Sequence, residues 1–135
     1  MYNFCKNCGS SNVVNVNETH FTCENCGHVF YPQPSAAVGA FIIKDEQILL
    51  VERLEEPYKN DWVIPSGFID YGESPLAALR REMEEELGIV VVNPRLFFSE
   101  IGKDNPKKPI LGLYYLIEEF EGNLQAATDE IGKYQ

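Results

Sequence analysis

The sequence has no long apolar segment. None of its 135 residues belongs to a run of about 18 apolar side chains, the length that a membrane-spanning helix needs. The first residues, Met-Tyr-Asn-Phe-Cys-Lys, have neither the basic nor the apolar region of a signal peptide. We therefore expect a cytoplasmic protein that does not associate with membranes.

Basic side chains are also scarce. The chain has 11 Lys and Arg against 21 Asp and Glu, a formal net charge of -10. This charge repels a nucleic-acid backbone and argues against nonspecific nucleic-acid binding. It would also repel any other phosphate-bearing ligand. If the protein acts on phosphates, a cation from outside the chain must bring them in, and a divalent metal ion is the obvious candidate.

Cysteine is absent after residue 26. The four cysteines form two C-x-x-C-G motifs, Cys5–Gly9 and Cys23–Gly27, with 14 residues between Cys8 and Cys23. This spacing predicts a tetrahedral zinc site made by Cys5, Cys8, Cys23 and Cys26. Two disulfides or a redox pair are the alternatives, and a reducing cytosol and the duplicated motif disfavour them. Four thiolates leave the ion no open position, so this zinc would be structural.

The segment around the cysteines is interpreted as a small zinc ribbon. Its short strand-like stretches are residues 12–17, 20–23 and 29–31. His20 and His28 are either spare ligands or ordinary ribbon histidines. Residues 1–34 contain one Lys and no Arg, so the basic surface of a nucleic-acid-binding ribbon is missing.

Two prolines, Pro32 and Pro34, predict an extended linker and a domain boundary, with a zinc ribbon at 1–34 and a larger domain at 35–135. In the larger domain Ser74 and Pro75 mark the start of a helix and Gly88 its end. Helix and strands mix in this domain, which predicts an α/β or α+β fold. The strand-like segments are residues 36–43, 47–53, 89–92, 96–101 and 110–120.

The helix over 74–88 has an unusual acidic flank. Glu82, Glu85 and Glu86 stand at i, i+3 and i+4, beside an apolar stripe with helical spacing. Three carboxylates that converge on one small volume repel one another unless a hard divalent cation lies between them. The alternative is an ordinary solvated acidic face. The stripe consists of Leu76, Leu79, Met83 and Leu87.

The residues around this helix decide between the two readings. From Gly67 to Ile89 the sequence matches G-x5-E-x7-R-E-U-x-E-E-x-G-U, with U aliphatic, at every position. In this motif the chain resembles the Nudix hydrolase family, and the resemblance covers the chain from about residue 36 to its end. It implies a three-layer α/β/α sandwich with a mixed sheet. A zinc ribbon ahead of this domain is similar to the arrangement in NADH pyrophosphatase-like members. The family domain usually continues with another strand and a final helix, so we expect these to be missing here, either because the sequence is truncated or because this member is short.

The resemblance also implies roles for the motif residues. Glu82, Glu85 and Glu86 would bind catalytic Mg²⁺ or Mn²⁺, with one of them open as the general base. The backbone carbonyl of Gly67 would be a further ligand. Arg81 would pair with Glu73 to hold the helix against the preceding loop. Ser66 stands where a glycine commonly precedes Gly67 in the family.

Other residues are weighed with an alternative beside each. Glu130 lies where many Nudix enzymes have another metal-binding or base glutamate, and a plain surface glutamate is the alternative. Arg53 would meet a substrate phosphate or else point to solvent. Trp62, Phe98 and Tyr114 could stack on a base, although aromatic residues on strands more often belong to a core.

The function that the resemblance implies is metal-dependent hydrolysis of a nucleoside diphosphate linked to another moiety. ADP-ribose, FAD, NADH and nucleotide sugars are the expected small-molecule substrates, and a nucleoside triphosphate stays open. Against NADH, the S-Q-P-W-P-F-P-x-S array of NADH pyrophosphatases is absent, and residues 90–100 stand in its place. The alternative is a non-catalytic nucleotide-sensing module whose ribbon contacts a protein. Association into a homodimer is left open.

Overall fold

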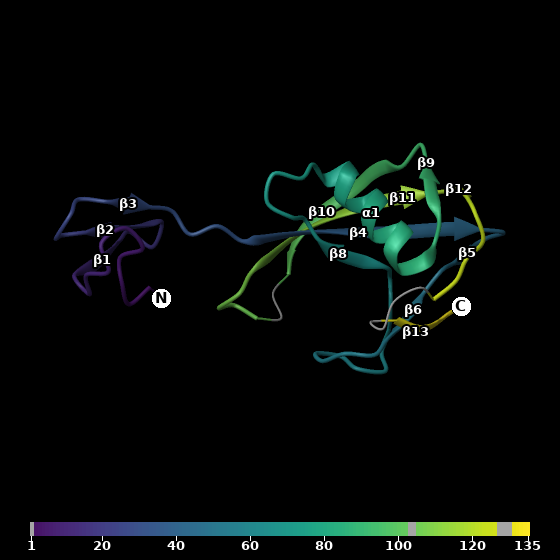
Figure 1. Ribbon diagram of the computed structural model, residues 1–135, viewed down its shortest axis with the longest axis horizontal. Helices are drawn as coiled ribbons and strands as arrows, with labels where there is room; N and C mark the ends of the chain where they lie inside the picture. The colour runs from purple at the N-terminus through teal and green to yellow at the C-terminus, as the bar shows by residue number, and fades with distance from the viewer. Residues whose placement is uncertain (1, 103–104, 127–130) are drawn as a thin grey trace. The chain divides into compact units, whose positions relative to one another are not determined.

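The computed structural model describes residues 2–102, 105–126 and 131–135. The chain divides into two compact units, Met1–Pro34 and Ser35–Gln135, which Figure 1 shows joined by an extended segment. Each unit is described separately below. Within the described residues, no helix is both long and apolar enough to cross a membrane.

The first unit is a three-stranded antiparallel sheet. Its strands are β1 (Val13–Val16), β2 (His20–Cys23) and β3 (Val29–Phe30), in the order β1-β2-β3. Phe21 and Phe30 stack with ring centroids 5.3 Å apart, and the ring of Tyr2 meets both edge-on. A core this small buries little apolar surface, so the unit depends on a further constraint such as bound metal.

The second unit is built on a mixed sheet. Its central strand β4 (Ser35–Lys44) pairs in parallel with β11 (Ile110–Ile117), and β10 (Arg95–Gly102) lies antiparallel at the outer side of β11. The other side of β4 pairs antiparallel with β5 (Gln47–Ile48) and β8 (Ser66–Phe68). Figure 1 shows β4 and β11 running behind the helix. The mixed sheet that the sequence analysis predicts is therefore present.

Two strands that the sequence presents as continuous are broken. After β5 the chain leaves the main sheet, and β6 (Val51–Arg53) pairs with β7 (Trp62–Val63) and β13 (Ile131–Tyr134). The segment 110–120 likewise divides into β11 and β12 (Glu119–Glu121), and β12 pairs with β9 (Val90–Val92). An apolar run indicates that a segment is buried, but the strands that it pairs with decide where one strand ends and the next begins.

The one helix of the described residues, α1 (Pro75–Leu87), has the predicted ends. The Ser74 hydroxyl accepts the backbone N–H of Ala77 at 3.2 Å, and Pro75 stands in the first turn. Gly88 ends the helix with a φ of 67°, and its N–H donates to the Glu84 carbonyl at 3.0 Å. Glycine adopts this left-handed conformation without steric cost, which explains where the helix stops.

The core lies between α1 and one face of the sheet. Leu79, Met83 and Leu87 are fully buried, as the apolar stripe predicts, but Leu76 is exposed. Leu76 belongs to the first turn of the helix, and Ala78 is the first residue of the helix that belongs to the buried core. The helix packs against side chains of β4, β9 and β11 and their neighbours: Val38, Ala40, Ile42, Ile89, Val91, Tyr115 and Ile117.

The opposite face of the sheet carries the alternate residues of the same strands, among them Phe41 and Tyr114. No helix of the described residues covers this face. The structure thus shows an α/β fold with one helical layer, and the second layer of the expected three-layer sandwich remains a prediction.

Candidate functional site

Helix α1 presents its three motif glutamates in different environments. Glu86 is buried, the side chain of Glu82 is 13% exposed, and that of Glu85 is 55% exposed. A carboxylate is rarely buried unless hydrogen bonds or a cation stabilise it. The three glutamates of the helix therefore differ in exposure: Glu85 faces the solvent and Glu86 lies at the edge of the core.

Glu82 packs directly on the backbone of Gly67. A Cβ atom at position 67 would overlap the Glu82 carboxylate, so no other residue fits there without movement. Gly67 is held in place by β8, where it pairs with Val38 of β4. The strand and the helix therefore bring a backbone segment and a carboxylate together. Oxygen donors of this kind are the ligands that Mg²⁺ and Mn²⁺ prefer, so the residues present fit such an ion.

Arg81 joins the helix to the loop before it. Its Nε donates to Glu73 Oε1 and its Nη2 to Glu73 Oε2, both at 2.9 Å, which is a bidentate pair. Nη2 also donates to the Phe68 carbonyl at 3.0 Å. The Arg81 guanidinium holds the pKa of Glu73 below its usual range, and the backbone N–H of Asp70 acts in the same direction. The hydrogen bonds to Glu73 in turn raise the pKa of Arg81.

Arg81 also contacts two of the three motif glutamates. Its Nη1 lies 2.8 Å from Glu82 Oε1 and 3.4 Å from Glu85 Oε2, whereas Glu86 lines a cleft. Within the part of the chain that the structure describes, the four cysteines are the only group of three or more His, Cys, Asp or Glu side chains whose ligand atoms all lie within 4.8 Å of one another. The three motif carboxylates do not form such a group here, and their convergence on a metal ion stays a prediction.

The cleft beside Glu86 has a volume of about 50 Å³. Arg53 lines the same cleft, and its Nε donates to the Pro57 carbonyl at 3.0 Å. Glu55 also lines it and was missed by the sequence analysis, since it stands in a loop with no motif or periodicity. The complete lining is Val51, Arg53, Glu55, Val63, Ile64, Ser66 and Glu86.

The other residues singled out in the sequence, where the structure describes them, do not line this cleft. Trp62 is partly exposed on β7, and Phe98 and Tyr114 belong to the sheet face opposite α1. Glu130 lies outside the described residues.

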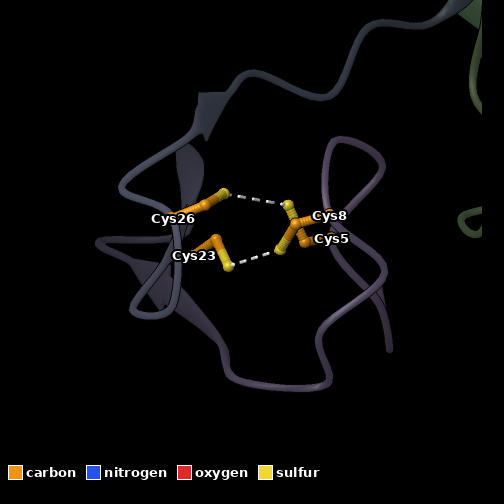
Figure 2. A group of neighbouring side chains, drawn as sticks. All are labelled: Cys5, Cys8, Cys23 and Cys26. Atoms are coloured by element: carbon orange, nitrogen blue, oxygen red, sulfur yellow. Dashed lines mark hydrogen bonds between the residues drawn. The ribbon is translucent and has the colours of Figure 1, made fainter.

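The four cysteines converge in the first unit. Sγ atoms lie 3.8 Å apart for Cys5 and Cys26 and 3.7 Å apart for Cys8 and Cys23, and Figure 2 shows the sulfurs pointing toward one another. A tetrahedron with Zn–S bonds of about 2.3 Å has sulfurs about 3.8 Å apart. A disulfide needs about 2.05 Å, and all four thiols are free. The cluster therefore has the donor set and the spacing of a tetrahedral zinc site.

The two cysteine motifs repeat the same local geometry. The N–H of Gly9 donates to the Cys5 carbonyl and that of Gly27 to the Cys23 carbonyl, both at 2.8 Å. The two glycines have φ values of 74° and 72°, as the C-x-x-C-G pattern requires.

An asparagine precedes the second cysteine of each motif. The Asn7 amide contacts Cys26 Sγ, and the Asn25 amide contacts Cys8 Sγ, each at 3.7 Å. Each motif therefore donates to a sulfur of the other. The sign of this exchange in the sequence is the asparagine repeated before the second cysteine of each motif, which was not predicted to contact a sulfur.

The histidines of the first unit do not join the sulfur cluster. His20 Nδ1 contacts Thr19 Oγ1 at 2.9 Å, and the ring of His28 stacks on Phe30 with centroids 6.0 Å apart. They are ribbon histidines, the second of the two readings left open above.

Comparison with known proteins agrees with this arrangement. The family model for the NUDIX domain matches residues 33–135. The chain belongs to the Nudix family. An ADP-ribose pyrophosphatase of Methanocaldococcus jannaschii is 32% identical over 101 residues, which cover 73% of this chain and 59% of that protein. An 8-oxo-dGTP diphosphatase of Haemophilus influenzae is 41% identical over 88 residues, covering 63% and 64% of the two chains.

A third relative extends into the first unit. The NAD-capped RNA hydrolase NudC of Chromobacterium violaceum is 28% identical over 130 residues, 96% of this chain and 48% of that protein. Among solved structures, a MutT NUDIX hydrolase from Burkholderia pseudomallei has a TM-score of 0.73 and 30% identity, covering 77% and 82% of the two chains. This Nudix chain spans less than two thirds of the length of the three curated relatives.

Proposed function

We propose that the unit at residues 35–135 hydrolyses the phosphoanhydride bond of a nucleoside diphosphate linked to another moiety. The observation that carries this proposal is the fit of Glu82 on Gly67, with Arg81 bound to Glu73 beside it. A solvated acidic face would need neither the close packing nor the bidentate pair. The full Nudix motif and the family match support the same activity.

Glu82, Glu85, Glu86 and the Gly67 carbonyl would hold Mg²⁺ or Mn²⁺. Such ions neutralise the charge of a diphosphate and make a bound water more acidic. With a net charge of -10, the chain itself supplies little of that neutralisation. Cys5, Cys8, Cys23 and Cys26 would hold a structural Zn²⁺ in the unit at residues 1–34.

The chain's own residues would bind the phosphate, position the helix and accept a proton. Arg81 and Glu73 are positioning residues, because their contacts fix helix α1 relative to the loop that precedes it. Arg53 lies in the cleft with Glu86 and would contact a phosphate oxygen. One glutamate takes the proton of the attacking water. The water oxygen bonds to one phosphorus, the bridging P–O bond breaks, and the other phosphate leaves.

The choice of substrate rests on the curated relatives and on the missing NADH specificity array. The likeness to an ADP-ribose pyrophosphatase favours ADP-ribose, with FAD and nucleotide sugars in the same class. NADH is disfavoured because the specificity array is missing from residues 90–100. The identity of 41% to an 8-oxo-dGTP diphosphatase makes a modified nucleoside triphosphate the second candidate. The three-layer sandwich remains the expected architecture of the whole domain.

A substrate panel tests the proposal. ADP-ribose, FAD, NADH, nucleotide sugars and triphosphates are incubated with the full chain and Mg²⁺ or Mn²⁺, and phosphate-containing products are measured. We expect Glu85→Gln to lower kcat by about 10²- to 10⁴-fold. Glu84→Gln is the matched control, since Glu84 is exposed on the same helix and is variable in the motif.

Two outcomes would overturn the catalytic proposal. One is full activity in Glu85→Gln. The other is binding of a nucleotide by the wild-type chain without turnover of any substrate, which would favour the nucleotide-sensing module instead.

A further inference from the structure

The sheet face opposite α1 carries a group of four aromatic side chains, Phe41, Phe97, Phe98 and Tyr114, called here the aromatic platform. Successive residues of a strand normally point to opposite faces. In β10 the register shifts between Leu96 and Phe98, which makes Phe97 the extra residue of a β-bulge. The rings of Phe97 and Phe98 consequently both lie near Phe41, with centroids 5.9 and 5.8 Å away.

Tyr114 lies flat on the sheet beneath this bulge. A Cβ atom at Gly39 or at Gly112 would come within 2.7 Å of the Tyr114 side chain. Two strands therefore leave out a side chain where the tyrosine ring rests on the backbone, and glycine in a strand often marks such a close approach. Phe98 stacks on Tyr114 with centroids 4.6 Å apart and planes 20° apart. The platform is a built arrangement of rings.

The platform adjoins the cleft that contains Glu86. Ile64 Cδ1 lies 3.1 Å from the same Cβ position at Gly39 that the Tyr114 ring crowds, so both side chains reach one spot on β4. Ile64 lines the cleft together with Glu86, and so does Ser66, the strand partner of Gly39. A molecule with its diphosphate in the cleft can therefore extend over the platform.

The outer rings of the platform are open to solvent. Phe97 is 60% exposed and Phe98 is 39% exposed. We propose that Phe98, supported by Tyr114, stacks on the purine base of the nucleotide whose diphosphate lies in the cleft, and that Phe97, whose ring stands at 74° to that of Phe98, contacts the edge of the base. The inference rests on the proposed function and names the part of the substrate that this face recognises.

A purine suits this surface for two reasons. The base is the uncharged part of a nucleotide, so the net charge of -10 does not oppose its binding. A purine offers a larger stacking area than a pyrimidine and would reach from the face of Phe98 to the ring of Phe97. A second copy of the chain is a poorer occupant: a stable protein interface buries about 800 Å² per partner, whereas a phenylalanine buries only about 150–250 Å².

A pair of substrates tests the inference in the full chain. ADP-ribose is compared with diribosyl diphosphate, which has the same phosphoanhydride and no base. Phe98→Ala should raise KM for ADP-ribose by about 5- to 150-fold, the loss expected when one base–aromatic stack is removed, and Phe97→Ala should raise it by less. Both variants should leave kcat/KM for diribosyl diphosphate unchanged. UDP-ribose should respond less than ADP-ribose.

Leu96→Ala is the matched control. Leu96 is an exposed apolar residue of the same strand, and it pairs with Tyr115, which faces α1. Phe98→Trp should keep the affinity for ADP-ribose, which separates loss of stacking from loss of folding. Equal losses for both substrates, or no change in KM, would overturn the inference.

A binding measurement separates this inference from the proposed function. AMP is titrated into the wild-type chain, and the ring resonances of Phe97 and Phe98 are followed by NMR. Shifts of these resonances support the platform even if no substrate is hydrolysed. If the rings do not respond to AMP, or if Phe97→Ala instead changes the oligomeric state in light scattering, the face binds something else.

Discussion

The carboxylate of Glu82 occupies the space in which any side chain at position 67 would begin, so Gly67 and Glu82 are fitted to each other. The φ angle of Gly67 is not in the left-handed region, and a larger residue is excluded by contact alone. Strand β8 and helix α1 are therefore in direct contact at the proposed site.

Gly67→Ala should displace Glu82. The added methyl group must push the carboxylate or the strand away, and overpacking of this kind costs about 1–3 kcal/mol. We expect a lower free energy of unfolding and a large fall in kcat, measured by urea titration and by hydrolysis of the best substrate of the panel. Gly102→Ala is the control, because its Cβ would lie 3.6 Å from the Ile110 carbonyl, an ordinary contact. Wild-type kcat in Gly67→Ala would contradict the proposed role of this contact.

The pair of Glu73 and Arg81 should make stability depend on pH in acid. The pKa of Glu73 is below its usual value in the folded protein, because Arg81 and the Asp70 N–H stabilise its charged form. Between the folded and the unfolded pKa values the unfolded chain binds more protons, so the stability contributed by this group falls as the pH falls. It is complete above the unfolded value of about 4.3 and is lost as the pH drops through the folded pKa.

Urea unfolding from pH 7 to pH 3 measures this effect. Trp62, the single tryptophan, stands in the second unit, so its fluorescence reports on that unit. Glu73→Gln should be less stable than wild type at pH 7 and should depend less on pH in acid. Glu84→Gln, a change at an exposed position of α1, should keep the wild-type slope. Parallel profiles for wild type and Glu73→Gln would show that the pair does not titrate as described.

Zinc removal should unfold the first unit alone. The unit has a small aromatic core, and its four cysteine sulfurs form the proposed metal site. A chelator should abolish the signals of residues 2–34 in an NMR spectrum and leave the Trp62 unfolding transition unchanged. Purified protein that contains no zinc and keeps these signals would refute the metal assignment.

The exchanged asparagines should tune the affinity for zinc. Asn7→Ala and Asn25→Ala each remove an amide that contacts a sulfur of the other motif. Loss of such an outer contact lowers metal affinity by about 10- to 100-fold. Competition with a chromophoric chelator measures the change. Asn15→Ala, at an exposed position of β1, is the control and should bind zinc like the wild type.

Ser74→Ala should weaken helix α1 without touching the glutamates. Its hydroxyl accepts the Ala77 N–H, and loss of such a cap costs about 0.5–2 kcal/mol. Thermal unfolding should show a lower Tm, and Ser74→Asp should restore it because aspartate is an equally good cap. An unchanged Tm in Ser74→Ala would show that the first turn is held by other contacts.

Local patterns in the sequence determined much of this protein. The two C-x-x-C-G motifs predict the sulfur cluster, and Ser74, Pro75 and Gly88 predict the helix ends, because each depends on residues close together in the chain. The Nudix motif likewise predicts the pairing of Arg81 with Glu73, eight residues apart and joined through one loop.

Only the tertiary structure decided what depends on distant segments. The division of Glu82, Glu85 and Glu86 into buried and exposed groups, and the bridge that Arg81 makes between two of them, follow from how α1 packs on β4 and β8. Glu86 and Arg53 line one cleft although they stand 33 positions apart in the sequence. Spacing along a helix predicts which side chains share a flank, but strand register and packing decide what each of them faces.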